Sequence, residues 1–319
     1  MKKGLLILTV AALGFTACNG GFKKGPAGLL YKIDNDVKGD SIQEGDFISL
    51  EVVAKTEADS VMYSTYELGK STQTLVQKPA YPGDLFYAIK MLNVGDSATI
   101  KIDLDSAAAK GQPRPQNIKG RYIIYNLKID KVIHKDTANQ QAFQDAIQAF
   151  FKVEADKAKS LESGKIKKYI DDNKLKVEKL PSGLQMAIVT EGNGEKPVAG
   201  DSVQVNYTGR LTSGKVFDTS LEDVAKKENV FNPGRPYKTL DLIIGKGNVI
   251  AGFDEAILNM KKGEKAIVLI PSSLGYGDRG MPGGMIGPFT PLVFELQLVN
   301  VIHKDSTATA APTAPAPQK

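Results

Sequence analysis

The chain has 319 residues, of which 42% are hydrophobic, enough for two ordinary domains with packed cores. Its formal net charge is only +5, and no basic block or basic helix face stands out, which argues against nucleic acid as a partner. The single cysteine excludes an internal disulfide, and no further cysteine is present to build a metal site with it.

The N-terminal segment has the pattern of a signal peptide. Lys2 and Lys3 precede the apolar run Gly4–Phe15, which is too short to span a bilayer. Small residues then lead into Cys18, and the letters "GFTAC" resemble a bacterial lipobox, in which the cysteine is lipidated and becomes the first residue of the mature protein. An ordinary signal peptide that happens to end at a cysteine is the alternative, and both alternatives predict export.

The lipobox resemblance divides the first residues into a signal peptide, 1–17, and a lipidated Cys18 with a flexible tether, 18–28, rich in glycine. A lipidated terminus of this kind carries several acyl chains, so it implies stable anchoring to the membrane. By resemblance to other lipoproteins, Asn19 after the cysteine favours the outer membrane, facing the periplasm. Without its signal peptide the chain carries a net charge of +3, since Lys2 and Lys3 are removed.

The rest of the chain contains an ordered internal repeat. The numbering offset between matched segments is 155 at first and 168 or 169 later: "EGDFISLEV" (44–52) with "AGDSVQVNY" (199–207), "VMYST" (61–65) with "VFDTS" (216–220), "MLNVGDSATIKID" (91–103) with "NMKKGEKAIVLIP" (259–271), and "VIHKD" at both 132–136 and 301–305. The increase in offset predicts a longer loop in the second copy, around Leu221–Lys238. Two related domains are therefore expected, because solenoid repeats have far shorter periods.

Each copy has the pattern of a sheet with one short helix. Alternating apolar residues predict strands at Ser202–Tyr207, Ala266–Ile270 and Leu292–Val299. Helical spacing predicts one helix, Gly252–Met260, stopped by Gly263. We therefore predict an α+β fold with two domains, residues 29–137 and 177–304.

The segment between the two domains differs in kind. Residues 138–176 contain apolar side chains at helical spacing and no strand alternation, so we expect a helical linker of one or two helices, interrupted near Ser163–Gly164. Its apolar stripe packs on its own protein, dimerises or binds clients; the sequence leaves these alternatives open. Residues 305–319, rich in Ala, Pro and Thr, predict a disordered tail.

Three stretches of the second copy carry a family resemblance. "VQVNYTGRLTSGKVFDTS" (203–220), "LIIGKGNVIAGFDEAI" (242–257) and "GYGDRGMPGGMIGPFTPLVFELQLVNV" (275–301) resemble an FKBP-type peptidyl-prolyl cis/trans isomerase, over about residues 177–303. The resemblance implies an antiparallel half-barrel sheet wrapped on a short helix, with a shallow proline pocket. It also implies protein substrates with X-Pro bonds, here exported proteins, and binding of the macrolide inhibitors of this family.

The resemblance also assigns site residues. Tyr207 and Phe217 would form pocket walls and Asp218 a carboxylate at the rim, while the Ile250 N–H and the Tyr276 hydroxyl would hold substrate carbonyls. The residues it implies for catalysis are Tyr207, Phe217, Asp218, Ile250 and Tyr276. Those it implies for substrate binding are Leu240, Val249, Phe253, Ile286 and Phe294. Because isomerisation breaks no covalent bond, no cofactor, metal or nucleophile is expected.

The first copy lacks these residues. Val52, Met62 and Tyr63 stand where the second copy has Tyr207, Phe217 and Asp218, so we interpret the first domain as degenerate. The first domain could bind client proteins, form a dimer or act as a spacer from the membrane. A homodimer could form through the linker or through this domain. The rival hypothesis from another class is a periplasmic chaperone, a holdase with weak or no isomerase activity.

Two further patterns receive other interpretations. "GYGDRG" (275–280) matches a dinucleotide-binding pattern, but the "MPGGMIGPFTP" that follows cannot open the required helix. His134 and His303, the only histidines, each end a predicted strand, and we expect surface residues there rather than metal ligands.

Overall fold

The structure is a computed structural model that describes residues 21–115, 118–281 and 285–304. The chain forms two compact units, and apart from Thr65–Ser71 the first comprises residues up to Lys135 and the second begins at Asp136. The predicted signal peptide, Cys18 and the tail 305–319 lie outside the described residues. Within the described part, no helix is both long and apolar enough to cross a bilayer.

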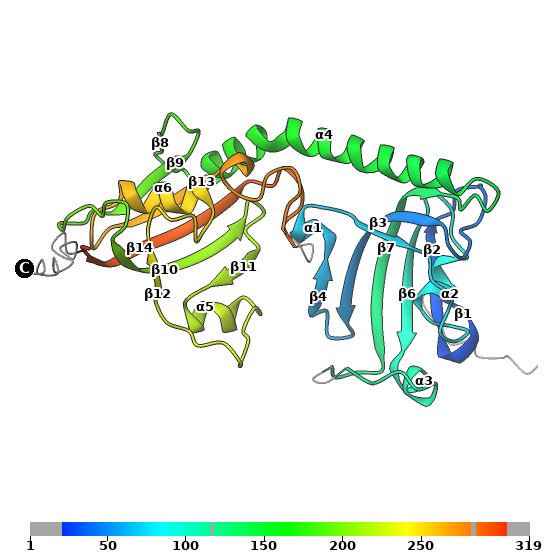
Figure 1. Cartoon of the computed structure of the whole chain (residues 1–319). Helices are drawn as coiled ribbons and strands as arrows, with labels where there is room; N and C mark the ends of the chain where they lie inside the picture. The colour runs from blue at the N-terminus through cyan, green and yellow to red at the C-terminus, as the bar shows by residue number, and fades with distance from the viewer. Residues whose placement is uncertain (1–20, 116–117, 282–284, 305–319) are drawn as a thin grey trace, which may run out of the picture. The chain divides into compact units, whose positions relative to one another are not determined.

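The first unit is built on a seven-stranded antiparallel sheet in the order β1-β2-β6-β7-β3-β4, with β5 also paired to β3 (Figure 1). Its strands are β1 (Lys23–Lys24), β2 (Leu30–Asn35), β3 (Phe47–Thr56), β4 (Val61–Ser64), β5 (Thr72–Leu75), β6 (Ser97–Asp103) and β7 (Tyr122–Ile133). The helical segments in this part of the chain are the 3-10 turn η1 (Pro26–Gly28), α1 (Thr65–Leu68), α2 (Leu85–Ile89) and α3 (Leu104–Ala109).

The second unit contains a sheet of the same size, in the order β11-β10-β14-β13-β9-β8, with β12 also paired to β10. Its strands are β8 (Glu178–Lys179), β9 (Gln185–Thr190), β10 (Ser202–Leu211), β11 (Val216–Thr219), β12 (Leu240–Ile243), β13 (Lys265–Ile270) and β14 (Leu292–Ile302). Its helical segments are α4 (Gln140–Asp172), α5 (Glu222–Lys227), α6 (Ala251–Asn259) and the 3-10 turn η2 (Ser272–Leu274).

The two sheets have the same topology, strand for strand. When the second sheet is written in the order β8-β9-β13-β14-β10-β11, each strand takes the position of its repeat counterpart in the first sheet. β12 likewise corresponds to β5. The correspondence extends to irregularities, because the β3 bulges at Ser49/Leu50 and Ala54/Lys55 recur at the matching positions of β10, Gln204/Val205 and Gly209/Arg210. The predicted α+β duplication is confirmed, and the extra loop lies between β11 and β12.

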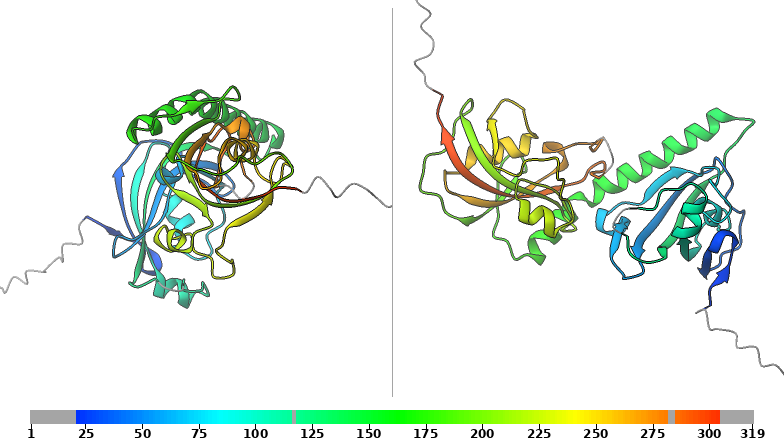
Figure 2. Two further views of the ribbon diagram at one scale, coloured as in Figure 1. Left: turned by 90° about the vertical axis from the view of Figure 1, so that its left-hand side faces the viewer. Right: turned by 90° about the horizontal axis from the view of Figure 1, so that it is seen from below.

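The short helix of the second unit is placed by its apolar face. Phe253, Ala256 and Ile257 of α6 are buried with Met260, and they pack against the inward side chains of β10, β13 and β14. The helix therefore lies across one face of the sheet (Figure 1 and Figure 2). In the first unit, Ala88 and Ile89 of α2 occupy the corresponding core.

The repeated "VIHKD" forms the same structural contact in both units. In the first, Asp46 is 2% exposed and accepts hydrogen bonds from the His134 ring, at 2.9 Å, and from the Lys135 N–H, at 2.8 Å. In the second, Asp201 accepts the corresponding bonds from His303, at 2.8 Å, and from Lys304, at 3.1 Å. The histidines are half-exposed, as predicted, but each has an acidic partner that the sequence did not reveal.

The linker is one continuous helix. α4 has 33 residues, and the Asn139 side chain caps it by accepting from the Ala142 N–H at 3.0 Å. The interruption expected near Ser163–Gly164 is wrong. A glycine inside a helix costs only about 1 kcal/mol relative to alanine, and tertiary packing offsets that cost.

The C-terminal part of α4 provides this packing. Ile166 is buried against Leu269 and Val293, which point to the face of the second sheet opposite α6. Glu162 accepts two hydrogen bonds from Ser272, one from its N–H and one, at 2.9 Å, from its hydroxyl. These contacts hold the end of the helix against the second unit.

The expected tether, 18–28, is wrong for its described part. Lys23 and Lys24 form β1, which pairs with β2 through Tyr31 and Leu30. The Lys101 ammonium also lies 4.6 Å from the centre of the Phe22 ring. These residues belong to the first sheet, so the folded domain begins earlier than residue 29.

Candidate active site

The strand pair β10–β11 carries the polar half of the site. Gly209 pairs with Asp218 and Arg210 with Val216, so Phe217 is the extra residue of a bulge. A bulge re-aims side chains, which allows two consecutive residues to face the same region. Phe217 thus packs into the core side while Asp218 reaches the Tyr207 hydroxyl.

Three polar side chains form a closed network. The Tyr207 hydroxyl donates to Asp218 Oδ2 at 2.7 Å, and Arg235 Nη2 donates to the Tyr207 oxygen at 2.7 Å. Arg235 Nη1 pairs with the other oxygen of Asp218. Each partner therefore orients the other two.

The pKa values of Tyr207 and Arg235 are both raised. Burial raises the pKa of Tyr207 to about 12, and the neighbouring Asp218 carboxylate adds to that shift. Burial opposes the charge on Arg235, but its bonds to Asp218 and Tyr207 outweigh this effect and raise its pKa. At neutral pH the tyrosine is therefore a neutral donor beside an ion pair.

Four aromatic rings form the apolar half of the site. Phe294 of β14 lies at the centre, with ring centroids 5.5 Å from Phe253, 5.7 Å from Phe217 and 6.3 Å from Tyr207. The contacts with Phe253 and Phe217 are edge-to-face, with interplanar angles of 89° and 82°. This is a preferred aromatic geometry, so the rings have a defined arrangement.

Gly209 makes room for this arrangement. A Cβ at this position would lie 2.6 Å from Phe217 Cζ and 2.9 Å from Phe294 Cε1. These distances are shorter than real contacts allow, so a larger residue would displace the rings. The corresponding residue in the first copy of the repeat is Ala54.

Two hydrogen-bond donors border the aromatic rings. Ile250 precedes α6, and among the described residues its N–H has no hydrogen-bond partner. The Tyr276 hydroxyl likewise forms no hydrogen bond within the described part of the chain, and burial, with Asp218 nearby, raises its pKa. Both donors are available to an external acceptor.

All ten residues that the family resemblance assigned meet in the second unit. Tyr207, Phe253, Ile286 and Phe294 belong to its buried core, and the other members are partly buried against it or bonded to Tyr207. Ile286 is held in place because its carbonyl accepts from the Met281 N–H at 2.9 Å. Leu240, on β12, packs against this core and lines a hollow beside Tyr207 and Arg235.

Sequence reasoning missed Arg235. It lies in the loop that the repeat identified as an insertion, well beyond Asp218 in the chain, and no pattern links the two residues. The loop is ordered by Phe231 and Tyr237, whose rings stack with centroids 5.3 Å apart. The Tyr237 hydroxyl also accepts from the Asn232 N–H at 2.8 Å. The one feature of the sequence that could have indicated Arg235 is that it is a single arginine in a loop with no counterpart in the first copy.

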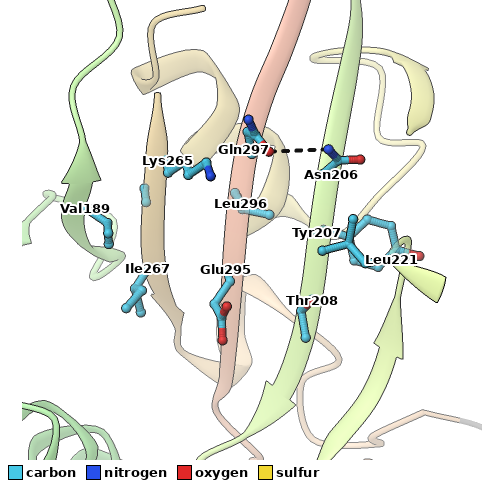
Figure 3. Close-up of a pocket in the computed structure, with 11 residues that line it drawn as sticks. Val189, Asn206, Tyr207, Thr208, Leu221, Lys265, Ile267, Glu295, Leu296 and Gln297 are labelled. Carbon is cyan, nitrogen blue, oxygen red and sulfur yellow. Dashed lines mark hydrogen bonds between the residues drawn. The ribbon is translucent and has the colours of Figure 1, made fainter. Parts of the chain in front are cut away.

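Another hollow lies on the opposite face of the sheet. It has a volume of about 210 Å³ and is lined by outward side chains such as Asn206, Thr208 and Glu295 (Figure 3). Tyr207 borders it but directs its hydroxyl elsewhere, toward Asp218. Across the described residues, no group of three or more metal-ligating side chains is present.

The first unit has no comparable site in its described residues. Val52 is buried in its core, whereas Met62 and Tyr63 on β4 are 47% and 40% exposed. The Tyr63 hydroxyl bonds to Thr72 Oγ1 at 2.8 Å rather than to a carboxylate. The fold is retained in the described part of this unit without the aromatic cluster or the ion pair.

Comparisons with known proteins agree with this geometry. A sequence model of the family described as FKBP-type peptidyl-prolyl cis-trans isomerase matches residues 193–299. FK506-binding protein 1A of Neurospora crassa is 41% identical over 120 residues, covering 37% of this chain and 88% of that protein. The peptidyl-prolyl cis-trans isomerase Mip of Coxiella burnetii is 38% identical over 132 residues, covering 41% of this chain and 50% of Mip.

A solved structure is also similar. The peptidyl-prolyl cis-trans isomerase of Pseudomonas syringae is 33% identical, with 46% of this chain and 96% of that chain covered and a TM-score of 0.36. The chain belongs to the FKBP-type peptidyl-prolyl cis-trans isomerase family. The whole matched range lies within the second unit.

Proposed function

We propose that the second unit isomerises X-Pro bonds by enclosing the proline among Tyr207, Phe253 and Phe294. The Ile250 N–H and the Tyr276 hydroxyl hold the carbonyls on either side of the proline while the bond turns. The observation that carries this proposal is that both donors lie at the edge of an aromatic cluster and have no partner within the described chain. Donors in such a position are satisfied when a peptide binds.

The energetic demand on this site is modest. Rotation about an X-Pro amide must overcome about 18–20 kcal/mol, because resonance is lost. A thousandfold acceleration requires about 4 kcal/mol less. An apolar pocket removes water from the planar, more polar amide and favours the twisted form. Asp218 and Arg235 fix the Tyr207 ring rather than transfer protons.

The substrates we propose are exported proteins, in or near the cell envelope. The support is the sequence alone: a signal-peptide pattern followed by Cys18, a lipidation site in this proposal. Anchoring is tested by growing cells with an alkyne-labelled fatty acid and comparing the full chain with Cys18→Ala. Label on the wild type that is absent from the variant supports the proposal, and equal labelling contradicts it.

The isomerase proposal is tested on the full chain with a proline-containing peptide and a protease-free readout. Asp218→Val and Tyr276→Phe should each lower kcat/KM, while both variants keep their fold. Tyr63→Val is the matched control, because Tyr63 occupies the position of Asp218 in the first unit. We expect the control to have wild-type activity. A wild-type chain that accelerates no isomerisation, yet suppresses aggregation of an unfolded protein, would overturn the proposal in favour of a holdase.

A further inference from the structure

Two adjoining hollows lead from the end of β14 to the candidate site. The first, about 630 Å³, is lined by the end of β14, the start of β10, β12 and Val249. The second, about 390 Å³, is lined by Tyr207, Arg235 and the residues that precede and begin β12. Leu240 and Asp241 line both hollows, so together they form one path along β12.

The chain leaves the sheet at the start of this path. Ile302, the last residue of β14, lines the first hollow and is 53% exposed. Asp201 fixes the following residues by accepting from the His303 ring and from the Lys304 N–H. The segment that follows Lys304 therefore starts from a defined point beside the hollow.

The sequence that starts there is suited to a proline pocket. Residues 306–318 read "STATAAPTAPAPQ" and contain no charged, aromatic or large aliphatic side chain. They contain three Ala-Pro bonds, which end at Pro312, Pro315 and Pro317. Such a segment cannot bury an apolar face of its own, but it presents the chemical group that the candidate site encloses.

The segment is long enough to reach the site. Tyr207 is five residues along β10 from Ser202, the partner of Ile302, a distance of about 17 Å. β12 lies on the other side of β10 from β14, so the crossing adds about 10 Å. Pro312 is eight residues beyond Lys304, about 27 Å at full extension, and Pro317 is thirteen residues beyond it, about 43 Å. Pro312 can reach the site only if the chain before it is fully extended. Pro315 and Pro317 can reach it without full extension.

We propose that residues 305–319 bind in the isomerase site of their own chain, along the path lined by β12, as an intramolecular X-Pro ligand. This inference rests on the proposed function of that site. A short connection between a ligand and its site gives an effective concentration of about a millimolar. The tail therefore competes with weakly bound external substrates, and strong clients displace it.

The test compares three proteins: the wild type, a chain ending at Lys304, and a chain with Pro312, Pro315 and Pro317 all changed to Ala. The last keeps the length of the tail and removes only its prolines. For a tail that half-fills the site, we expect both altered chains to have about twofold higher kcat/KM on a proline peptide than the wild type. A dissociation constant well below the effective concentration would make the increase larger.

Nuclear magnetic resonance gives a second readout. In the wild type, cis–trans exchange of the tail Ala-Pro bonds should be faster than in the Asp218→Val variant, at a rate independent of protein concentration. Amide shifts of Leu240 and Val249 should change when the tail is removed. Equal kcat/KM in all three proteins with unchanged shifts would overturn the inference and leave the isomerase function standing. Exchange that speeds up with protein concentration would overturn binding to the same chain. A tail-free chain inactive on peptides would overturn both proposals.

Discussion

Gly209→Ala adds one methyl group at a crowded point of the candidate site. The added Cβ would lie 2.6 Å from Phe217 and 2.9 Å from Phe294, whereas ordinary contact begins near 3.4 Å. The rings must therefore move by several tenths of an ångström to about 1 Å. Overpacking of this kind costs about 1–3 kcal/mol of unfolding free energy.

The catalytic effect should exceed the effect on folding. A domain stable by about 5–15 kcal/mol remains folded after this loss. A displacement near 1 Å of groups that position the substrate can lower the rate about a hundredfold. We expect kcat/KM on a proline peptide to fall by about ten- to a hundredfold, while the chain stays monodisperse and unfolds cooperatively in urea.

The first unit supplies the matched control. Ala54→Gly makes the reverse change at the corresponding position, where Ala54 pairs with Tyr63 as Gly209 pairs with Asp218. We expect it to cost about 0.5–1 kcal/mol, because glycine weakens a strand, and to leave activity unchanged. A Gly209→Ala chain with wild-type kcat/KM and an unchanged urea midpoint would refute the role assigned to this glycine.

Three further predictions concern single contacts. Arg235→Ala should lower kcat/KM on the order of fivefold, which corresponds to about 1 kcal/mol, because the ion pair with Asp218 is partly exposed and therefore screened. Arg235→Lys should lower kcat/KM by less. An unchanged kcat/KM in both variants would contradict the orienting role of Arg235. Ile166→Ala should lower the urea stability of the second unit by about 2–4 kcal/mol, whereas the exposed control Val153→Ala should change it by less than about 0.5 kcal/mol. Hydrogen bonds to two carboxylates raise the pKa of His303, so its stabilising effect is complete below the unfolded value near 6.5 and is lost as pH rises through the raised value. His303→Gln should therefore cost more unfolding free energy at pH 6 than at pH 9, and equal losses at both would contradict this linkage.

The repeat spacing was the most informative feature of the sequence. The offsets between matched segments depend only on strand order and loop length, so they predicted the duplication and located the inserted loop. Nine of the ten site residues could be assigned because they lie in the three segments with a family pattern; Leu240 lies just before the second of these segments. Their common location follows from the β10 and β11 register and from α6, which the same segments specify.

Other features depend on contacts between distant residues. Arg235 reaches Asp218 across an inserted loop, and no local pattern encodes that approach. Gly209 reads as an ordinary strand glycine until the positions of both phenylalanines are known. β1 is too short to show alternation, and pairing with β2 defines it. Gly164 looks like a helix end because its neighbours alone do not reveal the sheet that supports α4.

The matching strand order of the two sheets has a consequence for folding. A chain with two interchangeable sets of strands can pair a strand from one copy with a partner from the other, a known failure of repeat proteins. Synthesis opposes this exchange, because α4, β8 and β9 all emerge between the end of β7 and the start of β10. At about 5–20 residues per second, α4 alone takes about 2–7 s to synthesise, and sheets of this kind fold in milliseconds to seconds. The first sheet can therefore close before β10 exists. During refolding from denaturant both copies are present from the start. The full chain should therefore misassemble more often in refolding than during synthesis, when the first copy emerges before the second.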